Sequence, residues 1–283
     1  MSVRQDGQNA ARRETGAPFA FEEGPPVLQR HLPYDPGAGA RLPGTRPLGD
    51  APWLIADEAY AGQMALRDRL LADCPEVVLA LDPGARPAAQ ELLDEVLADL
   101  PEGFAQAGDR VTRPDGVVVA IDPARPMETL CRLVQEDLCI LEKTEGAEEH
   151  VLTAATLCFP ARWRLSEKFM RPLVAIHAPV PEYDEGVARR VQRMFDGLRP
   201  GLPIWRFNVL WHDDPTLHQP GPPAARPKWA PERAAYLRTE RQVLRRLPKT
   251  RAVVFSIHTY MLAAEDVPEG PGSAADDVQK RVE

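Results

Sequence analysis

The sequence lacks the short motifs that identify the commonest nucleotide-dependent and hydrolytic enzymes. No G-x-G-x-x-G and no G-x-x-x-x-G-K-[ST] pattern occurs in its 283 residues, so it carries no recognisable dinucleotide or P-loop site of its own. H-E-x-x-H and G-x-S-x-G are absent too, which argues against a zinc peptidase or a serine hydrolase of the common types. The chemistry has to be inferred from less specific features.

Cysteine is also scarce. The four cysteines are Cys74, Cys131, Cys139 and Cys158, and none of them forms a C-x-x-C pair with another. This spacing fits neither a zinc site nor a disulfide framework, and the absence of C-x-x-C-H argues against a covalently attached c-type haem. The set is equally unsuited to hold an iron–sulfur cluster. We expect four buried, inert thiols.

Positive charge and long apolar runs are lacking as well. The chain has 34 Lys and Arg against 42 Asp and Glu, a formal net charge of -8, so it has no overall basic surface for nucleic acid. No run of about 18 apolar residues occurs, and the N-terminus has no apolar stretch typical of a signal peptide. We expect a cytoplasmic protein that binds neither nucleic acid nor membrane.

The composition is that of a globular protein. Hydrophobic residues make up 44% of the sequence, and no internal repeat is visible. Residues 1–28 are polar and rich in Gly and Pro, and residues 266–283 are acidic and rich in small residues, so both ends are predicted to be disordered. One large domain is predicted over residues 29–265.

Hydrophobic periodicity predicts an α+β domain with a mainly antiparallel sheet flanked by helices. The helical pattern is clearest over 184–198, where apolar residues recur at steps of three and four. The other predicted helices lie at 57–73, 88–99, 128–139 and 232–247. The predicted strands lie at 117–121, 151–159, 173–178, 204–211 and 252–262.

Two of the predicted strands each have one polar face. Side chains alternate across a strand, so Arg206, Asn208 and His212 share one face of the first strand. His258 and Tyr260 share one face of the second, together with Ser256. If the strands are neighbours, these faces line a common pocket for anions or hydrogen-bonding groups; otherwise they are solvated surfaces.

A single histidine, His177, lies near the end of the predicted strand 173–178. As a strand residue it shares a face with Leu173, Ala175 and Pro179, which leaves room for a broad, flat ligand such as a porphyrin. The alternative is a structural histidine that hydrogen-bonds a nearby carbonyl.

Charged residues mark two of the predicted helical segments. Arg238, Arg241 and Arg245 fall on one face of the predicted helix 232–247. They form either a clamp that binds carboxylates or a solvated surface that pairs with Glu240. Glu142 is one of the acids inside an otherwise apolar, helix-like run at 133–144. If the Glu142 carboxylate projects into an apolar pocket, it is suited to bind a cationic amine. If it lies on the solvated side of the helix, it has no such role.

Four blocks of the sequence together resemble the haem-dependent oxidative N-demethylase family. They match in order and spacing over most of the chain: QEDLCILEK (135–143), LTAATLCFPARWRLSEKFMRPLVAIHAPVPEY (152–183), RFNVLW (206–211) and LRTERQVLRRLPKTRAVVFSIHTYM (237–261).

The resemblance implies a PAS-like fold that holds haem b non-covalently. It also implies O2-dependent demethylation of a small secondary amine, similar to dimethylamine, to formaldehyde and a primary amine. Electrons would come from NADPH through a partner reductase that contains flavin and an iron–sulfur cluster, because this chain has no such site. The alternative is a PAS-like protein that senses or binds haem or another small molecule without turnover.

The resemblance also implies roles for particular residues. His177, in IHAPVP, corresponds to the axial ligand of the haem iron. Arg206, Arg241 and His258 are expected to bind the propionates and line the polar distal pocket, although relatives are expected to have a longer basic residue at position 258. Glu142 and Tyr260 are the candidate catalytic residues, which would orient the amine or O2.

Overall fold

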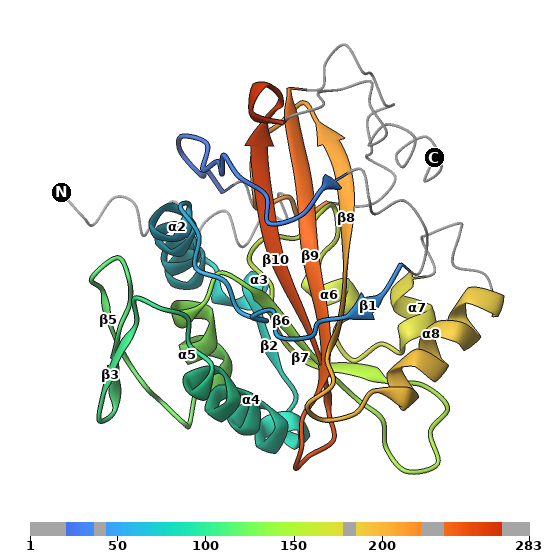
Figure 1. Ribbon diagram of the computed structural model, residues 1–283. Coiled ribbons are helices and arrows are strands. Elements are labelled where there is room, and N and C mark those ends of the chain that lie inside the picture. The colour runs from blue at the N-terminus through green and yellow to red at the C-terminus, as the bar shows by residue number, and fades with distance from the viewer. Residues whose placement is uncertain (1–20, 37–43, 178–184, 222–234, 268–283) are drawn as a thin grey trace, which may run out of the picture.

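Seven antiparallel strands form one sheet through the middle of the molecule (Figure 1). The computed structural model describes residues 21–36, 44–177, 185–221 and 235–267. From one edge of the sheet to the other, the strands are β1 (Arg46–Pro47), β8 (Ile204–His212), β9 (Tyr236–Arg246), β10 (Val253–Ala263), β6 (Asp137–Glu142), β7 (Val151–Thr156) and β2 (Leu79–Leu81).

Helices flank this sheet, and a second, small sheet lies beside them (Figure 1). The helices are α2 (Tyr60–Asp73), α3 (Pro75–Val78), α4 (Arg86–Ala98), α5 (Pro126–Leu133), α6 (Leu165–Lys168), α7 (Leu173–His177) and α8 (Glu185–Gly197), with short 3-10 turns at Pro83–Ala85 and Ala264–Asp266. The small sheet has the order β3 (Ala105–Ala107), β4 (Arg110–Thr112) and β5 (Val118–Ala120).

The hairpin of β9 and β10 is the longest pairing in the sheet. Every residue from Tyr236 to Arg246 has a partner in β10, and Leu247 closes the hairpin by donating its N–H to the carbonyl of Ala252, 2.9 Å away. The carboxylate of Glu91 in α4 accepts the backbone N–H groups of Lys249 and Thr250 at the tip. These bonds fix the register of the two central strands.

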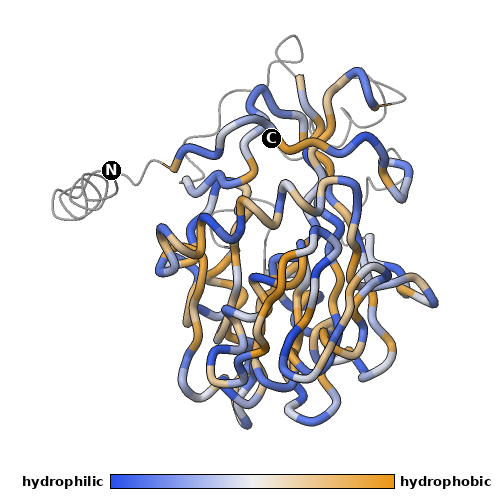
Figure 2. Tube along the Cα trace, turned by 90° about the vertical axis from the view of Figure 1, so that its left-hand side faces the viewer, coloured by the Kyte–Doolittle hydropathy of each residue, from blue (hydrophilic) through white to orange (hydrophobic). Residues whose placement is uncertain are grey.

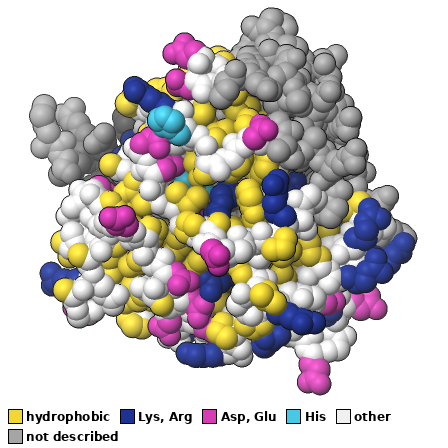
Figure 3. Space-filling view, in the orientation of Figure 1, with side chains coloured by type: hydrophobic (Ala, Val, Ile, Leu, Met, Phe, Trp, Pro, Cys, Tyr) yellow, Lys and Arg dark blue, Asp and Glu magenta, His cyan; other side chains and the backbone are white. Residues whose placement is uncertain are grey.

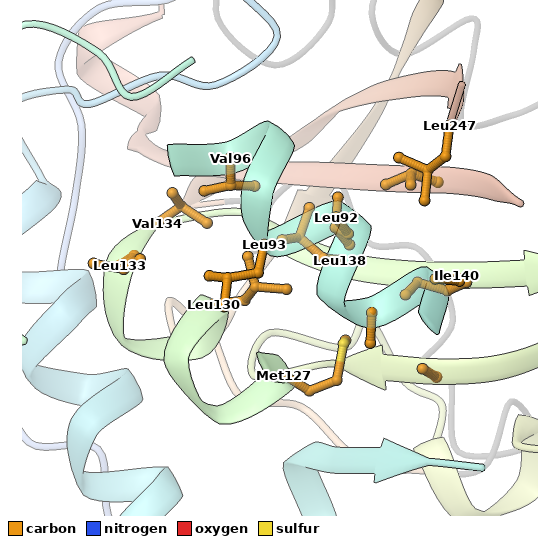
Figure 4. Close-up of a cluster of buried hydrophobic side chains, with 14 of the residues drawn as sticks. Leu92, Leu93, Val96, Met127, Leu130, Leu133, Val134, Leu138, Ile140 and Leu247 are labelled. Carbon is orange, nitrogen blue, oxygen red and sulfur yellow. The ribbon is translucent and has the colours of Figure 1, made fainter. Parts of the chain in front are cut away.

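Helices α4 and α5 cover one face of the sheet, which we call the α4 face. The side chains that fill this core are fully or almost fully buried, and they point toward one another from two helices and β6 (Figure 4). They include Leu92, Leu93, Val96, Met127, Leu130, Leu133, Leu138 and Ile140. Along the chain, the hydrophobic segments concentrate in the strands and the inner parts of the helices, with polar segments at the outer loops (Figure 2).

Helices α6, α7 and α8 cover the opposite face, which we call the α8 face. Leu173 of α7 and Phe195 of α8 pack in one cluster with Leu244 of β9, and Phe255 of β10 packs against the same cluster. This second cluster is smaller and less completely buried than the first, because several of its members remain partly exposed. The hydrophobic cluster on the α4 face is therefore more completely buried than the cluster on the α8 face.

Most of the predicted elements are confirmed. The helices expected at 57–73, 88–99 and 184–198 are α2, α4 and α8, with ends shifted by a few residues. The strands expected at 117–121, 151–159, 204–211 and 252–262 are β5, β7, β8 and β10. The chain forms one mixed domain with a large antiparallel sheet, as the periodicity indicated.

Three predicted elements are wrong. The segment 173–178 is not a strand, because residues Leu173–His177 form α7; a short apolar run does not distinguish a strand from a buried helix. Within the segment 232–247, Tyr236–Arg246 form β9 and not a helix. Its Arg, Gln, Glu and Leu residues favour a helix, but pairing with β8 and β10 on both sides overrides that preference.

The third predicted element is wrong only in its second half: the helix expected over 128–139 is present as α5 up to Leu133. Helix α5 ends at Leu133, Val134 is extended (φ -119°, ψ 154°), and β6 begins at Asp137. Asp137 and Glu142 are thus strand residues, Glu136 lies in the bend before β6, and none of the three is on the solvated side of a helix. Once the chain is extended at Val134, the apolar residues that follow pair with β10 and β7.

The first described residues belong to the packed part of the chain. Phe21, Val27 and Leu28 pack against a cluster formed by α2, α3 and the segment after β7. The predicted limits of the domain at residues 29 and 265, and the disorder of the two ends, stay predictions; residues 1–20 and 268–283 lie outside the described residues. Among the described helices, none combines the length and the apolar character that a membrane span requires.

Replacing Leu138 by Ala tests the α4-face core. Leu138 of β6 is 0% exposed among the side chains of α4 and α5, so Leu138→Ala is expected to lower the free energy of unfolding by about 2–5 kcal/mol through lost contacts and a residual cavity. Urea denaturation followed by circular dichroism measures the change. The control is Val118→Ala in β5, where Val118 is 54% exposed and a change within about 0.5 kcal/mol is expected.

Candidate functional site

One set of polar residues from β8 and β9 lies on the α8 face because of the register of these strands. Asn208 pairs with Glu240, and Glu240 pairs with Thr259 of β10. Directly paired residues point to the same side of a sheet, so these three side chains form one row. Arg206 and Arg238 belong to the rows before and after it, since each is two residues away along its strand.

Several buried polar atoms on this face have no hydrogen-bond partner among the described residues. They are Arg206 Nε, Arg238 Nε, His212 Nδ1 and Thr259 Oγ1. Buried polar groups in native proteins almost always have partners, so unpartnered atoms in adjacent rows of one surface indicate where a ligand or ordered water binds. This group is the basis of the candidate site.

Glu240 provides the negative charge at the centre of the group. Its Oε2 accepts hydrogen bonds from Asn208 Nδ2 at 2.9 Å and from Gln242 Nε2 at 3.1 Å, and its Oε1 lies 3.5 Å from Arg238 Nη2. Asn208 in turn accepts the backbone N–H of Glu240 at 2.8 Å. These bonds fix the carboxylate against the strand while it stays on the α8 face.

The two arginines of the site are only partly satisfied by hydrogen bonds and negative charge within the protein. Arg238 is 1% exposed and donates to the carbonyls of Leu217 and Phe159 at 3.0 and 2.6 Å, and burial lowers the pKa of its guanidinium despite the charge of Glu240. Burial likewise lowers the pKa of Arg206. Buried guanidinium groups with free N–H donors are suited to bind a carboxylate or phosphate.

His212 at the end of β8 is neutral at physiological pH. Burial first, and then the positive charges of Arg238 and Arg162, lower the pKa of its imidazole to about 4. Its Nδ1 is buried without a partner among the described residues. The imidazole can therefore accept or donate a hydrogen bond to a bound molecule without bringing a charge.

An apolar surface adjoins these polar groups. Phe255 is partly exposed although it lies in β10, a central strand, and Leu210 of β8 is partly exposed as well. Arg206, Asn208, Leu210, His212, Arg238, Glu240, Phe255 and Thr259 together are called the α8-face site below. The site combines an apolar surface with cationic donors, which suits an amphipathic ligand that carries carboxylates.

Helix α7 lies against the same face. Its residues Leu173 and Ile176 pack in the cluster that contains Phe255 and Leu244. His177 is the last residue of α7, but its side chain, like the segment 178–184 that follows, lies outside the described residues. The backbone thus brings His177 to the side of the sheet that carries Arg206.

His258 lies on the opposite side, the α4 face, in a buried ion-pair cluster. Its Nδ1 is 3.0 Å from Glu136 Oε1 and its Nε2 is 3.1 Å from Asp57 Oδ2, and the side chain is 1% exposed. Both ring nitrogens are therefore occupied by carboxylates. With both nitrogens donating, the imidazole is held in its protonated form.

The carboxylate partners of His258 hold the N-terminal segment against the sheet. Glu136 Oε1 accepts the backbone N–H of Ile55 at 2.8 Å, and the side chains of Gln135 and Gln29 donate to Asp57. Burial alone would lower the pKa of His258, but the hydrogen bonds and charges of Asp57 and Glu136 raise it to about 9. Burial alone would raise the pKa of Asp57, but the hydrogen bond and the charge of His258 lower it to about 2.

Arg241 and Tyr260 also lie on the α4 face. Arg241 Nη2 donates to the carbonyl of Pro52 at 2.6 Å, and the guanidinium lies over the ring of Trp205. The ring of Tyr260 lies 4.6 Å from that of His258, and burial raises the pKa of its hydroxyl. Tyr260 OH is buried without a partner among the described residues.

Glu142 lies at the far end of the sheet from Tyr260. Its Oε2 accepts a hydrogen bond of 2.6 Å from Thr153 Oγ1 in β7. Its neighbour Leu141 pairs with Val253, seven residues before Tyr260, which corresponds to about 23 Å along an extended strand. The two candidate catalytic residues therefore do not form one site.

The structure thus divides the residues predicted from the sequence. Arg206 and the end of α7 lie on the α8 face, whereas Arg241, His258 and Tyr260 lie on the α4 face. The residues that the sequence analysis missed as site residues are Glu240, Thr259 and Phe255, and Arg238 was placed on the wrong kind of element. Residues 238–242 are a continuous polar run, so the sequence contained no alternation that would have indicated a strand with one polar face.

A family model described as haem-dependent oxidative N-demethylase, alpha subunit-like, matches residues 44–282. The chain belongs to this family. The match includes α7 and all the strands that form the α8-face site. The family resemblance stated from the sequence is thereby confirmed, and the family name indicates dependence on haem and an oxidative reaction.

The residues of the α8-face site fit the haem of the N-demethylase family. A porphyrin needs an apolar surface for its ring, cationic donors for its two carboxylates and a ligand for its iron. Phe255 and Leu210 would supply the apolar surface for the ring. The unpartnered Nε atoms of Arg206 and Arg238 would supply the cationic donors for the carboxylates. The α4 face, in contrast, has the side chains of Arg241 and His258 already bonded within the protein.

The His258 cluster predicts how stability depends on pH. Because the pKa of His258 rises from 6.5 to about 9 on folding, its contribution is complete below pH 6.5 and is lost as the pH rises toward 9. The pKa of Asp57 falls from 3.8 to about 2, so its contribution is complete above pH 3.8 and is lost as the pH falls toward 2. Urea denaturation is expected to show a loss of stability from pH 6.5 to 9.

The matched variants are His258→Gln and His31→Gln. His258→Gln leaves two carboxylates buried without their cation, so it is expected to cost about 3–5 kcal/mol at pH 6.5 and to abolish the loss of stability above that pH. His31, whose side chain is 85% exposed, serves as the control and is expected to leave the pH profile unchanged. An unchanged profile in His258→Gln would show that the cluster does not carry the pH dependence.

Proposed function

We propose that this chain is the haem-binding subunit of a monooxygenase that removes a methyl group from a small secondary amine similar to dimethylamine. The products are formaldehyde and the primary amine, and the oxidant is O2. The observation that carries the proposal is the presence of two arginines with buried, unpartnered Nε atoms next to an apolar surface, on the side of the sheet where α7 ends in His177. Membership of the oxidative N-demethylase family supports the reaction class.

The proposed cofactor is haem b, held non-covalently on the α8 face in a PAS-like fold. In the sheet, the hairpin β6–β7 and the meander β8–β10 are separated by α6, α7 and α8, and β6 pairs with β10; this arrangement supports the PAS-like architecture. His177 is the proposed axial ligand of the iron. Arg206 and Arg238 are the proposed partners of the propionates, since each has a donor to spare.

When bound, the haem would supply the activation of O2 and the oxidation of the N-methyl group. The protein would bind and orient the amine and exclude water. Glu240 is suited to hold the cationic amine, because its carboxylate lies on the α8 face and is fixed by Asn208 and Gln242. His212, neutral because its pKa is about 4, is suited to form a hydrogen bond to a bound molecule at its unpartnered Nδ1.

The remaining candidate residues fit positioning roles better than direct contact. Arg241, His258 and Tyr260 pack the N-terminal segment against β9 and β10, whose other face carries the site. Glu142 joins β6 to β7 through Thr153. Contact of Arg241 and His258 with haem, and of Glu142 and Tyr260 with the amine or O2, stays a prediction from the sequence.

The proposed partner is a reductase that carries electrons from NADPH through flavin and an iron–sulfur cluster. The family description as an alpha subunit indicates a protein with further subunits. Basic side chains gather at the right-hand edge of the surface, where Figure 1 places α8 (Figure 3). Arg189, Arg190 and Arg193 of α8 are exposed, which suits an acidic partner surface. The proposed location is the cytoplasm.

Haem binding tests the location of the site. His177→Ala is expected to abolish stoichiometric binding of added haemin and the Soret band of an imidazole-ligated haem. Arg206→Gln is expected to weaken binding about ten- to hundred-fold, because a charge-assisted hydrogen bond contributes about 1.5–3 kcal/mol. Titration of the purified apoprotein with haemin, followed by absorption, measures both.

The controls use the same residue types away from the α8 face. His31→Ala changes an exposed histidine, and Arg245→Gln changes an arginine of β9 that faces Glu95 and Asp99 on the other side of the sheet. Both are expected to bind haemin like the native protein. Equal losses in Arg206→Gln and Arg245→Gln, or none in either, would contradict the placement of haem on the α8 face.

Turnover distinguishes the proposed enzyme from a PAS-like protein that only binds haem. The haem-loaded protein, supplied with an electron donor and O2, is expected to release formaldehyde from dimethylamine in proportion to the O2 consumed. Ethylamine, which has no N-methyl group, is the control and is expected to give none. Haem binding without formaldehyde from any N-methylated amine would favour a sensor or carrier.

A further inference from the structure

Two of the buried cysteines lie close enough to react with each other. Cys131 Sγ in α5 and Cys158 Sγ, just after β7, are 3.5 Å apart, and both residues are 0% exposed. A disulfide needs an S–S distance of about 2.05 Å, so closing the bond requires a movement of only about 1.5 Å. The sequence suggested inert single thiols, because no two of the four cysteines form a C-x-x-C pair.

A buried ion pair holds the backbone of both cysteines. Arg67 of α2 is fully buried and lies 2.7 Å from Asp137 through its Nη1. Arg67 Nε donates to the carbonyl of Cys131 at 3.1 Å, and Asp137 Oδ1 accepts the N–H of Cys158 at 2.8 Å. The same pair therefore fixes α5 and the end of β7 at this separation.

The environment makes the two thiols unequal. The hydrogen bond from Cys158 and the charge of Arg67, whose Nη2 is 3.9 Å from Cys131 Sγ, lower the pKa of Cys131 against the effect of burial. Burial and the hydrogen bond to Cys131 raise the pKa of Cys158. In dithiols that are oxidised in two steps, the thiol with the lower pKa reacts first.

We propose that Cys131 and Cys158 form a peroxide-sensitive dithiol–disulfide site. The thiolate of Cys131 attacks hydrogen peroxide, takes one oxygen to become a sulfenic acid and releases water after proton transfer. The thiol of Cys158 then attacks that sulfur, the S–O bond breaks, and a second water leaves with the proton of Cys158. Two thiols and one peroxide thus give one disulfide and two waters.

The cysteine pair is connected to the α8-face site by hydrogen bonds that side chains donate to backbone carbonyls. The carbonyl of Cys158 accepts a bond of 2.7 Å from His218 Nδ1, and the next carbonyl, that of Phe159, accepts one of 2.6 Å from Arg238 Nη2. Closing the disulfide pulls Cys158 toward α5 and strains both bonds. The redox state of the pair thereby acts on Arg238, a residue of the site.

Peptide mapping of the full-length protein tests the disulfide directly. Trypsin separates the cysteines, since Cys131 lies in 111–132, Cys139 in 133–143 and Cys158 in 144–162. After hydrogen peroxide, the intact mass is expected to fall by two hydrogen atoms, two of the four thiols become unreactive, and 111–132 is recovered linked to 144–162. Dithiothreitol reverses all three changes.

Variants of single cysteines provide the controls. Cys131→Ser and Cys158→Ser are expected to lose the linked peptide, and Cys139→Ser, which removes a buried thiol of β6, is expected to keep it. The measurement uses protein without haem, so its outcome does not depend on the proposed function. If a serine variant does not fold, the mapping of the native protein still decides the question.

Two outcomes would overturn the proposal. One is that all four thiols remain reactive while methionines are oxidised by the same dose of peroxide. The other is that 111–132 and 144–162 carry separate sulfinic acids and no link. The connection to the site is tested by hydrogen–deuterium exchange, where faster exchange around residues 211–221 is expected in the disulfide form and not in oxidised Cys131→Ser.

Discussion

The antiparallel register of β8, β9 and β10 is the constraint on which the rest of this structure depends. Because Asn208, Glu240 and Thr259 are paired across the three strands, Arg206, Asn208, Arg238 and Glu240 share the α8 face. The same pairing turns His258 to the other side of the sheet. A shift of one residue in either ladder would exchange the two faces and disperse the site. The closed tip of the β9–β10 hairpin prevents such a shift.

The two faces differ in how their buried cations are bonded. On the α4 face, His258 has both nitrogens bonded to carboxylates, and Arg241 donates to backbone carbonyls, so these charges stabilise the packing of the N-terminal segment. On the α8 face, Arg206 and Arg238 keep N–H donors without partners among the described residues. A charge whose hydrogen bonds are complete is structural, whereas incomplete bonding costs stability and is retained where a ligand completes it. This contrast locates the candidate site.

The sequence predicted part of this arrangement. The polar face of 204–212 and the apolar periodicity of 184–198 were read correctly, because each depends only on the spacing of residues within one element. The helix expected at 232–247 was wrong because local propensity favours a helix there, and pairing with two neighbouring strands reverses the preference. With β9 assigned as a helix, Arg238 and Arg241 were placed together, although the strand separates them onto opposite faces.

The sequence by itself determined the family, the mixed class of the domain, the absence of a nucleotide motif and the pattern of polar and apolar residues along β8 and β10. These properties are encoded in residue order and local period. The tertiary structure alone decided that β8 and β10 turn their polar faces to opposite sides, that His258 is enclosed by Asp57 and Glu136, and that Cys131 meets Cys158. Each depends on contacts between residues far apart in the chain, which are set by strand pairing and core packing and not by any local pattern.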